Sequence, residues 1–330
     1  MQKPAELLLY SWNTQASFFD EQSSDILQDI DSRIGANVQL IVVALQEAVK
    51  PGSQFISLIL PNHLRTKGFE QLRRSRLMGV GITTYKSLQQ FDLRLRGLRL
   101  ALFIRRSWLG EHPLPEVEEQ FCYCSGVYQW SLGKGALAFS LTLPEFGRIK
   151  FVNLHLPFSA ASLNSQDNSV RQAAIDVQTQ AVNDIWQQIV NTSPTDHLFL
   201  IGDFNYRVRL WNGETVENLD LNNHGELYSK RDELLAELKR EPPVLPTLME
   251  GIEGGGPKFA PTAKLLRGSR GEYNFGKQNR RAPSWCDRIL YVANPKLNCL
   301  SYERLDPNLA TSDSDHAAIV GRFSIAHQQS

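Results

Sequence analysis

The sequence has few cysteines, no long hydrophobic run and no excess of charge of either sign. Its four cysteines are too few and too irregularly spaced for a disulfide framework, and Cys122-Tyr-Cys124 lacks the two-residue spacer typical of zinc knuckles. No apolar stretch approaches the ~20 residues that span a bilayer. The first residues also lack the pattern of a signal peptide. We therefore expect a soluble protein with reduced thiols in the cytoplasm.

The charge balance restricts the class of partner. The 35 basic side chains equal the 35 acidic ones, whereas a general nucleic-acid coat protein carries a basic excess. No nucleic-acid partner is expected on this ground. Hydrophobic residues make up 42% and charged residues 21% of the 330, which is ordinary for a globular protein.

Short runs rich in β-branched and aromatic residues dominate the chain and predict strands. They are Leu7–Trp12, Leu40–Leu45, Met78–Thr84, Leu98–Ile104, Gly135–Leu143, Ile149–Leu154, Leu198–Ile201, Arg288–Val292 and Ala317–Phe323. Helical periodicity predicts helices over Ser169–Val190, Gly225–Arg240, Ser24–Ile34 and Ser53–Leu60. Many strands with few helices between them favour two packed sheets flanked by helices over a parallel βαβ series. The glycine-rich stretch Gly251–Pro257 is interpreted as a surface loop, so residues 1–330 are predicted to form a single domain.

Polar residues stand beside many of these strands, where loops on a rigid scaffold tend to form sites. They are Asn13, Glu47, His155, Asp203, Asn205, Asp287, Asp315 and His316. Each one alone is more often a turn residue or a helix cap. Together they suit metal-assisted phosphate hydrolysis.

The residue types suggest a division of work. Glu47, Asp315 and Asn13 offer the hard oxygen ligands that Mg²⁺ prefers. A water could be positioned and deprotonated by Asp203 with Asn205. The two histidines could neutralise a phosphoryl oxygen, and Asp287 could orient the ring of His316.

Two long motifs resemble the signatures of the inositol polyphosphate 5-phosphatases. They are Gly202-Asp-Phe-Asn-Tyr-Arg207 and Pro283-Ser-Trp-Cys-Asp-Arg-Ile-Leu290. Shorter matches follow in family order: Trp12-Asn13, Gln46-Glu47, Lys134-Gly135, Asn153-Leu-His-Leu156 and Ser314-Asp-His316. The resemblance spans the chain from about Leu7 to Phe323. It implies the α/β fold of the endonuclease/exonuclease/phosphatase superfamily, a four-layer α/β/β/α sandwich of two packed mixed sheets flanked by helices.

The resemblance also implies roles for individual residues. The implied metal ligands are Glu47, Asn13 and Asp315, with Mg²⁺ as the cofactor. The implied catalytic residues are Asp203 as general base, Asn205 beside it, His316 with Asp287 at the transition state, and His155 on the scissile phosphate. Cys286 is followed directly by Asp287-Arg288 rather than by a phosphatase-type loop that ends in arginine, so a cysteinyl-phosphate route is disfavoured.

A polyanionic substrate needs cations beyond the metal. The candidates for substrate binding are Lys134, Arg207, Lys264, Arg281 and Arg288. For Arg207 and Arg288 a structural salt bridge is an equal alternative. The sequence also departs from the family pattern at four positions: Ala263 replaces a tyrosine, Asn279 stands near the place of a lysine, and Pro157 and Phe158 replace small residues. These departures leave the preference for a 4-phosphate and the orientation of the inositol ring open.

The segment Arg65–Arg106 has eleven basic residues and two acidic ones, with apolar residues between them. It is interpreted either as a solvated face or as a peripheral contact with an anionic membrane.

The leading hypothesis is a Mg²⁺-dependent phosphomonoesterase that removes the 5-phosphate from phosphoinositides or soluble inositol polyphosphates. The alternatives are a nuclease of the same superfamily and a non-catalytic phosphoinositide-binding protein. Protein partners are not indicated.

Overall fold

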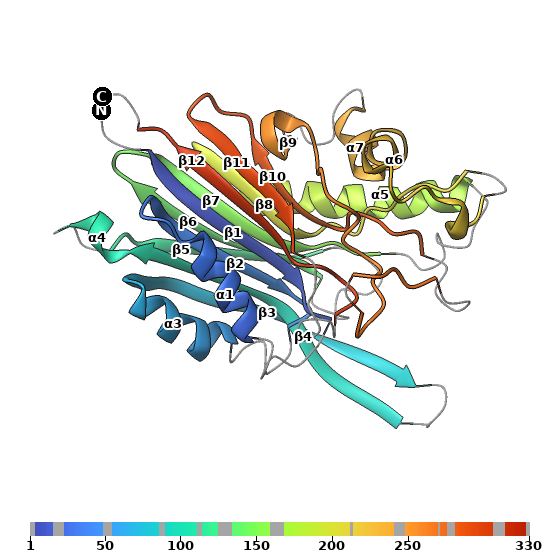
Figure 1. Cartoon of the computed structure of the whole chain (residues 1–330), viewed down its shortest axis with the longest axis horizontal. Helices are drawn as coiled ribbons and strands as arrows, with labels where there is room; N and C mark the ends of the chain where they lie inside the picture. Colours follow the sequence, from blue (N-terminus) through green and yellow to red (C-terminus); the bar gives the residue numbers. More distant parts are fainter. Residues whose placement is uncertain are drawn as a thin grey trace.

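The structure is a computed structural model that describes residues 4–15, 23–48, 55–85, 90–110, 114–124, 134–158, 168–211, 214–240, 248–269, 271–275, 281–305 and 314–327. Its centre is a pair of packed six-stranded mixed sheets (Figure 1). The first sheet contains, in spatial order, β11 (Leu297–Arg304), β12 (Ile319–Ile325), β1 (Ala5–Asn13), β2 (Val38–Gln46), β4 (Gln90–Arg105) and β3 (Phe69–Tyr85). The second contains β5 (Val117–Tyr123), β6 (Gly135–Leu143), β7 (Gly147–His155), β8 (His197–Asp203), β10 (Asp287–Val292) and β9 (Leu248–Glu250).

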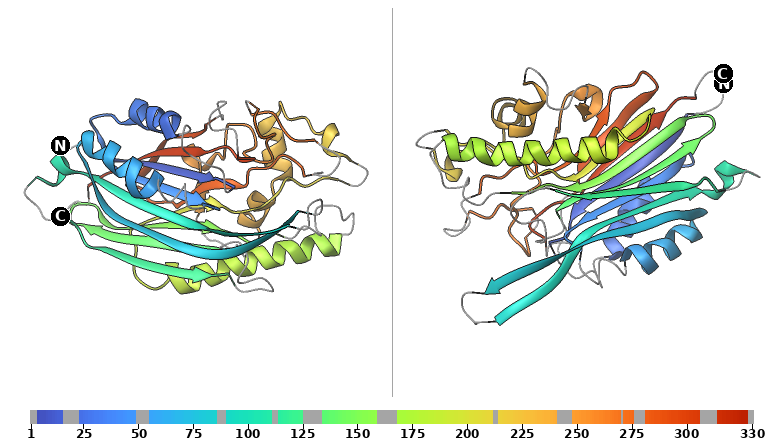
Figure 2. Two further views of the ribbon diagram at one scale, coloured as in Figure 1. Left: turned by 90° about the horizontal axis from the view of Figure 1, so that it is seen from below. Right: turned by 180° about the vertical axis from the view of Figure 1, so that it is seen from behind.

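Helices cover the outer faces of both sheets (Figure 2). The first sheet packs against α1 (Ser23–Arg33), the turn η1 (Phe55–Ile59) and α3 (Leu60–Thr66). The second packs against α5 (Asn168–Ile185) and its continuation η3 (Trp186–Val190). Shorter elements are α4 (Arg106–Leu109), α6 (His224–Arg231), α7 (Glu233–Leu238), η4 (Val216–Asn218) and η5 (Ile252–Gly254). Leu100, Phe139 and Phe199 belong to the buried core between the sheets. The predicted α/β/β/α sandwich is confirmed.

All nine predicted strands are present, but the sequence missed β5, β9 and β11. Two of these, β5 and β9, are the edges of the second sheet, and β11 is an edge of the first. Because one side of an edge strand faces solvent, its residues are more polar and the hydrophobic signal is weak. In β11, for example, buried and exposed positions nearly alternate.

The helix predicted over Gly225–Arg240 is wrong as a single helix, because the chain breaks at Asp232. That residue has extended dihedral angles (φ −74°, ψ 122°), and its carboxylate accepts a hydrogen bond of 2.9 Å from the backbone N–H of Leu235. It is therefore the N-cap of a second helix, α7, rather than an interior residue. The prediction for Ser53–Leu60 also ended too early, since α3 continues to Thr66. Among the described residues, no helix is long and apolar enough to cross a bilayer.

Strand pairing explains why the polar strand ends meet. The parallel strands β1 and β2 end together, with Asn13 opposite Gln46. In the second sheet the parallel strands β7 and β8 end with His155 opposite Asp203, and antiparallel β10 begins with Asp287 opposite the same Asp203. Both sheets therefore present their polar ends at one edge of the sandwich.

The hairpin formed by β3 and β4 continues past this edge. The backbone N–H of Ala48, just after Glu47, donates a hydrogen bond of 3.0 Å to the carbonyl of Gly97 in β4. Beyond Gly97 the two strands stay paired from Met78 to Tyr85, and Figure 1 shows this part projecting from the body.

Candidate active site

Asp203 stands at the centre of the polar edge. It is 1% exposed, and its Oδ2 accepts a hydrogen bond of 2.8 Å from the side-chain amide of Asn13 in the other sheet. The Nε2 atom of His155 lies 3.3 Å from the same oxygen. Burial alone would raise the pKa of Asp203, but the hydrogen bond from His155 and the charges of His155, His316 and Lys134 hold it well below its usual range. Asp203 is thus an ionised carboxylate in a buried setting.

The turn after β8 fixes Asn205 beside this carboxylate. The backbone N–H of Asn205 donates a hydrogen bond of 2.9 Å to Asp203 Oδ1, and its φ of 58° allows the chain to curl back. Its Nδ2 donates to the carbonyl of Leu156 at 3.0 Å, and its Oδ1 accepts from Arg207 Nη2 at 2.6 Å. Both polar atoms of the Asn205 side chain are therefore engaged, and the residue links Asp203 to Arg207 through hydrogen bonds.

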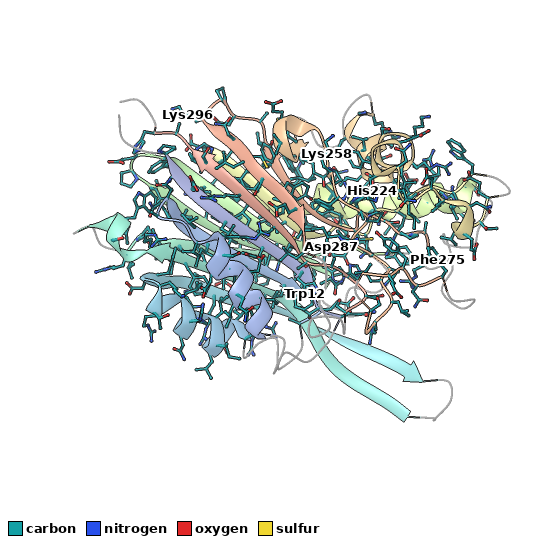
Figure 3. The ribbon with its side chains drawn as sticks, in the orientation of Figure 1. Trp12, His224, Lys258, Phe275, Asp287 and Lys296 are labelled. Atoms are coloured by element: carbon teal, nitrogen blue, oxygen red, sulfur yellow. The ribbon has the colours of Figure 1, made fainter. Side chains whose placement is uncertain are left out.

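His316 and Asp287 form a buried pair at the same edge. Their Nδ1 and Oδ2 atoms lie 2.8 Å apart, and the indole N–H of Trp12 donates to the backbone carbonyl of His316 at 3.0 Å. Burial would lower the pKa of His316, but the charge of Asp287 and its hydrogen bond raise it. Figure 3 shows Trp12 and Asp287 at the same end of the two sheets. The expected pairing of Asp287 with His316 is therefore present.

Glu47 follows β2 directly with a positive φ of 51°. Its side chain is 13% exposed, and Oε1 lies 3.8 Å from His155 Nε2. The predicted ligand is therefore brought next to Asp203 and His155, although its position in the sequence is more than 100 residues away from both.

Two buried carboxylate oxygens at this edge fit a divalent cation. Oδ1 of Asp287 and Oδ1 of Asp315 are buried with no hydrogen-bond partner among the described residues, and Glu47 contributes a further carboxylate nearby. Hard oxygen donors of this kind suit Mg²⁺. The residues present thus fit a metal of the predicted type.

A second grouping of candidate ligands is also present. Asp203, Asp287 and His316 bring one ligand atom each within 4.8 Å of one another. Since the hydrogen bond between Asp287 and His316 already uses an atom of each residue, we interpret that pair as an orienting pair rather than as the main ligands.

Four of the five predicted substrate-binding cations gather around this site. Lys134 contacts His155 Nε2, and Lys264 pairs with Asp315. Burial lowers the pKa of Lys134, although Asp203 and Glu47 oppose this shift. The guanidinium carbons of Arg207 and Arg281 lie 4.3 and 5.0 Å from the ring centroid of Phe158.

Arg288, the fifth predicted cation, does not lie with the other four. Its side chain is fully buried, with Nη1 2.6 Å from Glu250 Oε2 and Nη2 paired with Asp232. Both partners lie outside the two signature motifs that contain Asp203 and Asp287. The position of Arg288 agrees with the salt-bridge alternative rather than with substrate contact. Of the sequence departures, Ala263 is buried beside Ser284 and His316, whereas Asn279 lies outside the described residues.

Two further residues of the short motifs, Gln46 and Asn153, support the site. The Gln46 Nε2 atom donates to Asn153 Oδ1 at 2.8 Å, and Asn153 Nδ2 donates to the carbonyls of Leu45 (3.1 Å) and Arg99 (2.7 Å). Asn153 belongs to the second sheet and its partners to the first, so this buried amide network, the inter-sheet bridge, joins the sheets directly beneath Glu47 and His155. In the sequence, Gln46 directly precedes Glu47 and Asn153 stands two positions before His155. This proximity to two predicted site residues was the signal available.

Comparisons with known proteins agree with this geometry. Residues 10–322 match the family described as Endonuclease/Exonuclease/phosphatase family 2. Phosphatidylinositol 3,4,5-trisphosphate 5-phosphatase 1 of Xenopus laevis is 34% identical over 140 residues, which are 39% of this chain and 13% of that protein. Type I inositol polyphosphate 5-phosphatase 2 of Arabidopsis thaliana is 28% identical over 205 residues, covering 61% of this chain and 30% of that protein.

A solved structure shares the whole fold. The inositol polyphosphate 5-phosphatase domain of spsynaptojanin, in complex with inositol (1,4)-bisphosphate and calcium ion, superposes with a TM-score of 0.68 at 20% identity. The alignment covers 98% of this chain and 84% of that one. The chain spans less than a third of the length of the two curated relatives. It belongs to the endonuclease/exonuclease/phosphatase family 2, and the resemblance to inositol polyphosphate 5-phosphatases that its motifs indicate is confirmed.

Proposed function

We propose that the chain is a Mg²⁺-dependent phosphomonoesterase that removes the 5-phosphate from phosphoinositides or soluble inositol polyphosphates. The observation that carries this proposal is the buried carboxylate of Asp203, which Asn13 and His155 hold and whose pKa is kept low in part by the charges of His316 and Lys134. The names of the relatives supply the 5-position and the substrate class. The whole of residues 1–330 is proposed to act as one catalytic domain.

The residues of this chain divide the work as follows. Asp203, kept ionised, accepts a hydrogen bond from the attacking water and orients it toward phosphorus. His316, whose protonated form Asp287 favours, donates to a phosphoryl oxygen as negative charge develops there. His155, which lies beside Asp203, and Lys134, which contacts His155, bind the same phosphate.

Glu47, Asn13 and Asp315 are proposed to hold the metal. A bound Mg²⁺ would neutralise charge on the phosphoryl oxygens. Phosphoryl transfer depends on positioning and charge neutralisation more than on covalent chemistry, so these groups together are sufficient. Removal of one such donor should lower the rate by roughly 10²–10³.

The test is phosphate release by the full chain across defined phosphoinositides and inositol phosphates, with Mg²⁺ and with EDTA. A duplex with an abasic site tests the nuclease alternative in parallel. We expect phosphate release that needs Mg²⁺, and intact DNA. Nicking of the duplex without phosphate release would refute the proposal, and binding of phosphoinositide without turnover would favour the non-catalytic alternative.

We also propose a peripheral contact with an anionic membrane through part of Arg65–Arg106. Arg99 and Arg105 are not available for it, because they are buried or half-buried with backbone carbonyls as partners. Arg65, Arg74 and Arg76 are exposed, and Arg74 donates one N–H to the carbonyl of Ser57 at 2.5 Å while its side chain stays at the surface. The side chains of Lys86, Arg94 and Arg96 lie outside those described.

Each cation near an anionic surface contributes ~1 kcal/mol to membrane binding. Substituting Arg65, Arg74 and Arg76 by glutamine should therefore lower binding to vesicles that contain phosphatidylserine by about 100-fold. Arg240→Gln, on an exposed arginine of another region, is the control. Unchanged sedimentation of the triple variant with these vesicles would contradict the contact. A cytoplasmic location remains a prediction.

A further inference from the structure

Phe158 lies three residues after His155 and is half-buried between two arginines that are distant from it in the sequence. The guanidinium carbon of Arg207 is 4.3 Å, and that of Arg281 5.0 Å, from the centroid of its ring. Both distances are within the range of a cation–π interaction. One aromatic ring therefore holds two cations close to each other.

Neither guanidinium has a carboxylate within ion-pair distance among the described residues. Arg207 is 9% exposed and uses only Nη2, which donates to the neutral Asn205, while Nε and Nη1 are buried with no partner among the described residues. For Arg281, burial and the nearby charge of Arg207 lower the pKa, and the carboxylates that oppose this, Asp315 and Glu47, belong to the active site.

Arg288 is an arginine with a structural role in the same protein and serves as a comparison. Its guanidinium is paired with two carboxylates, those of Asp232 and Glu250, and its Nε donates to the carbonyl of Trp285 at 2.5 Å. Arg207, by contrast, has unused N–H groups within a buried site. Planar guanidinium groups with free N–H donors match the oxygens of a phosphate.

The two arginines adjoin the reacting groups without pairing with them. Asn205 Oδ1 accepts from Arg207 Nη2 at 2.6 Å, and the backbone N–H of Asn205 donates to Asp203 Oδ1 at 2.9 Å, so one residue links Arg207 to Asp203. Asp203 is held by Asn13 and His155, so the unused N–H groups of Arg207 are available to a second phosphate of the same substrate.

We propose that Phe158 is a specificity-determining residue, whose ring positions Arg207 and Arg281 as one clamp for a substrate phosphate that is not removed. This inference rests on the proposed function. It makes Phe158 a positioning residue, since its ring acts through the two arginines. The enzyme then favours substrates that carry a second phosphate.

The first arm of the test measures binding without turnover. Inositol 1,4-bisphosphate, which has no 5-phosphate, is titrated calorimetrically into wild type, Phe158→Ala, Phe158→Leu and Phe158→Tyr in buffer with EDTA. Loss of two cation–π contacts should weaken binding by about 10-fold in the alanine and leucine variants. The tyrosine variant, which keeps the aromatic face, should bind within about twofold of wild type. Equal affinity of Phe158→Ala and wild type would overturn the proposal.

The second arm separates the clamp from the reaction. With inositol 1,4,5-trisphosphate, Phe158→Ala should raise KM about 10-fold and leave kcat within about twofold. With p-nitrophenyl phosphate, which has one phosphate, both constants should be unchanged. Equal losses on the two substrates would overturn the clamp, because they indicate contact with the reacting phosphate or a disturbed fold.

Phe275→Ala, on a phenylalanine that is 42% exposed, is the matched control and should change nothing. Thermal unfolding of each variant verifies the fold. Absence of phosphate release by wild type from every substrate would refute the proposed function. The affinities measured in the first arm would then still show whether Phe158 positions the two arginines for a phosphate.

Discussion

Replacing Arg288 by methionine removes a cation that is buried completely and paired with two carboxylates. Glu250 accepts from Arg288 Nη1 at 2.6 Å and from the hydroxyls of Tyr228 (3.0 Å) and Tyr302 (2.9 Å). Asp232, the second partner, caps α7. The variant leaves both carboxylates without their counter-ion and keeps most of the side-chain volume.

Breaking such a buried pair by removing one partner costs about 3–5 kcal/mol. The entropy of unfolding is about 2.1 cal/mol/K per residue, which for 330 residues gives ~0.7 kcal/mol/K. The melting temperature should therefore fall by about 4–7 °C. KM for the substrate should stay unchanged, because Arg288 does not reach the active site.

The loss of stability in Arg288→Met should depend on pH. Burial raises the pKa of Asp232 to about 6, although the charge of Arg288 opposes the shift. A carboxyl with a raised folded-state pKa stabilises the fold below its unfolded value and loses this contribution as pH rises through the folded value. Without Arg288 that pKa rises further, so the variant should be closer to wild type at pH 5 than at pH 8.

The assay is chemical or thermal unfolding at both pH values together with steady-state kinetics. Arg240→Met, on an exposed arginine that pairs with Glu237 at 3.4 Å, is the control and should change stability by less than about 1 kcal/mol. Adding Asp232→Asn and Glu250→Gln to Arg288→Met should recover part of the loss, because no charge then remains unpaired. An unchanged melting temperature with a raised KM would refute the structural role and return Arg288 to the substrate site.

Three further predictions concern the active site and its support. Asp203→Ala should abolish phosphate release while the fold stays intact, and persistent turnover would remove this residue from the mechanism. Glu47→Gln should raise the Mg²⁺ concentration needed for half-maximal activity, so an unaltered titration would contradict its role as a ligand. Asn153→Leu leaves the amide of Gln46 and two carbonyls of the inter-sheet bridge unsatisfied, and should lower the stability by at least about 2 kcal/mol. It should also weaken the response to Mg²⁺, whereas a purely structural bridge would leave the titration of the folded variant unchanged.

The sequence predicted the sandwich and the composition of the candidate site because both depend on local signals. Buried strands consist of continuous apolar runs, and a polar residue at the end of such a run is visible without any knowledge of pairing. Parallel and antiparallel pairing then brings Asn13, His155, Asp203 and Asp287 to one edge, as the shared strand ends indicated. Edge strands such as β11 and the helix break at Asp232 were missed, because their local patterns are ambiguous.

The partners of the arginines could not be predicted in this way. Arg207, Arg281 and Arg288 all belong to or adjoin signature motifs, and their residue type alone predicts phosphate contact equally well for each. Only the tertiary structure separates them, since Arg288 meets two buried carboxylates whereas Arg207 and Arg281 meet the ring of Phe158 and no carboxylate within ion-pair distance among the described residues. The sequence by itself determined the chemistry available to this protein. Which charges are neutralised by the fold, and which remain for a ligand, depends on contacts between residues far apart in the chain and was decided by its packing.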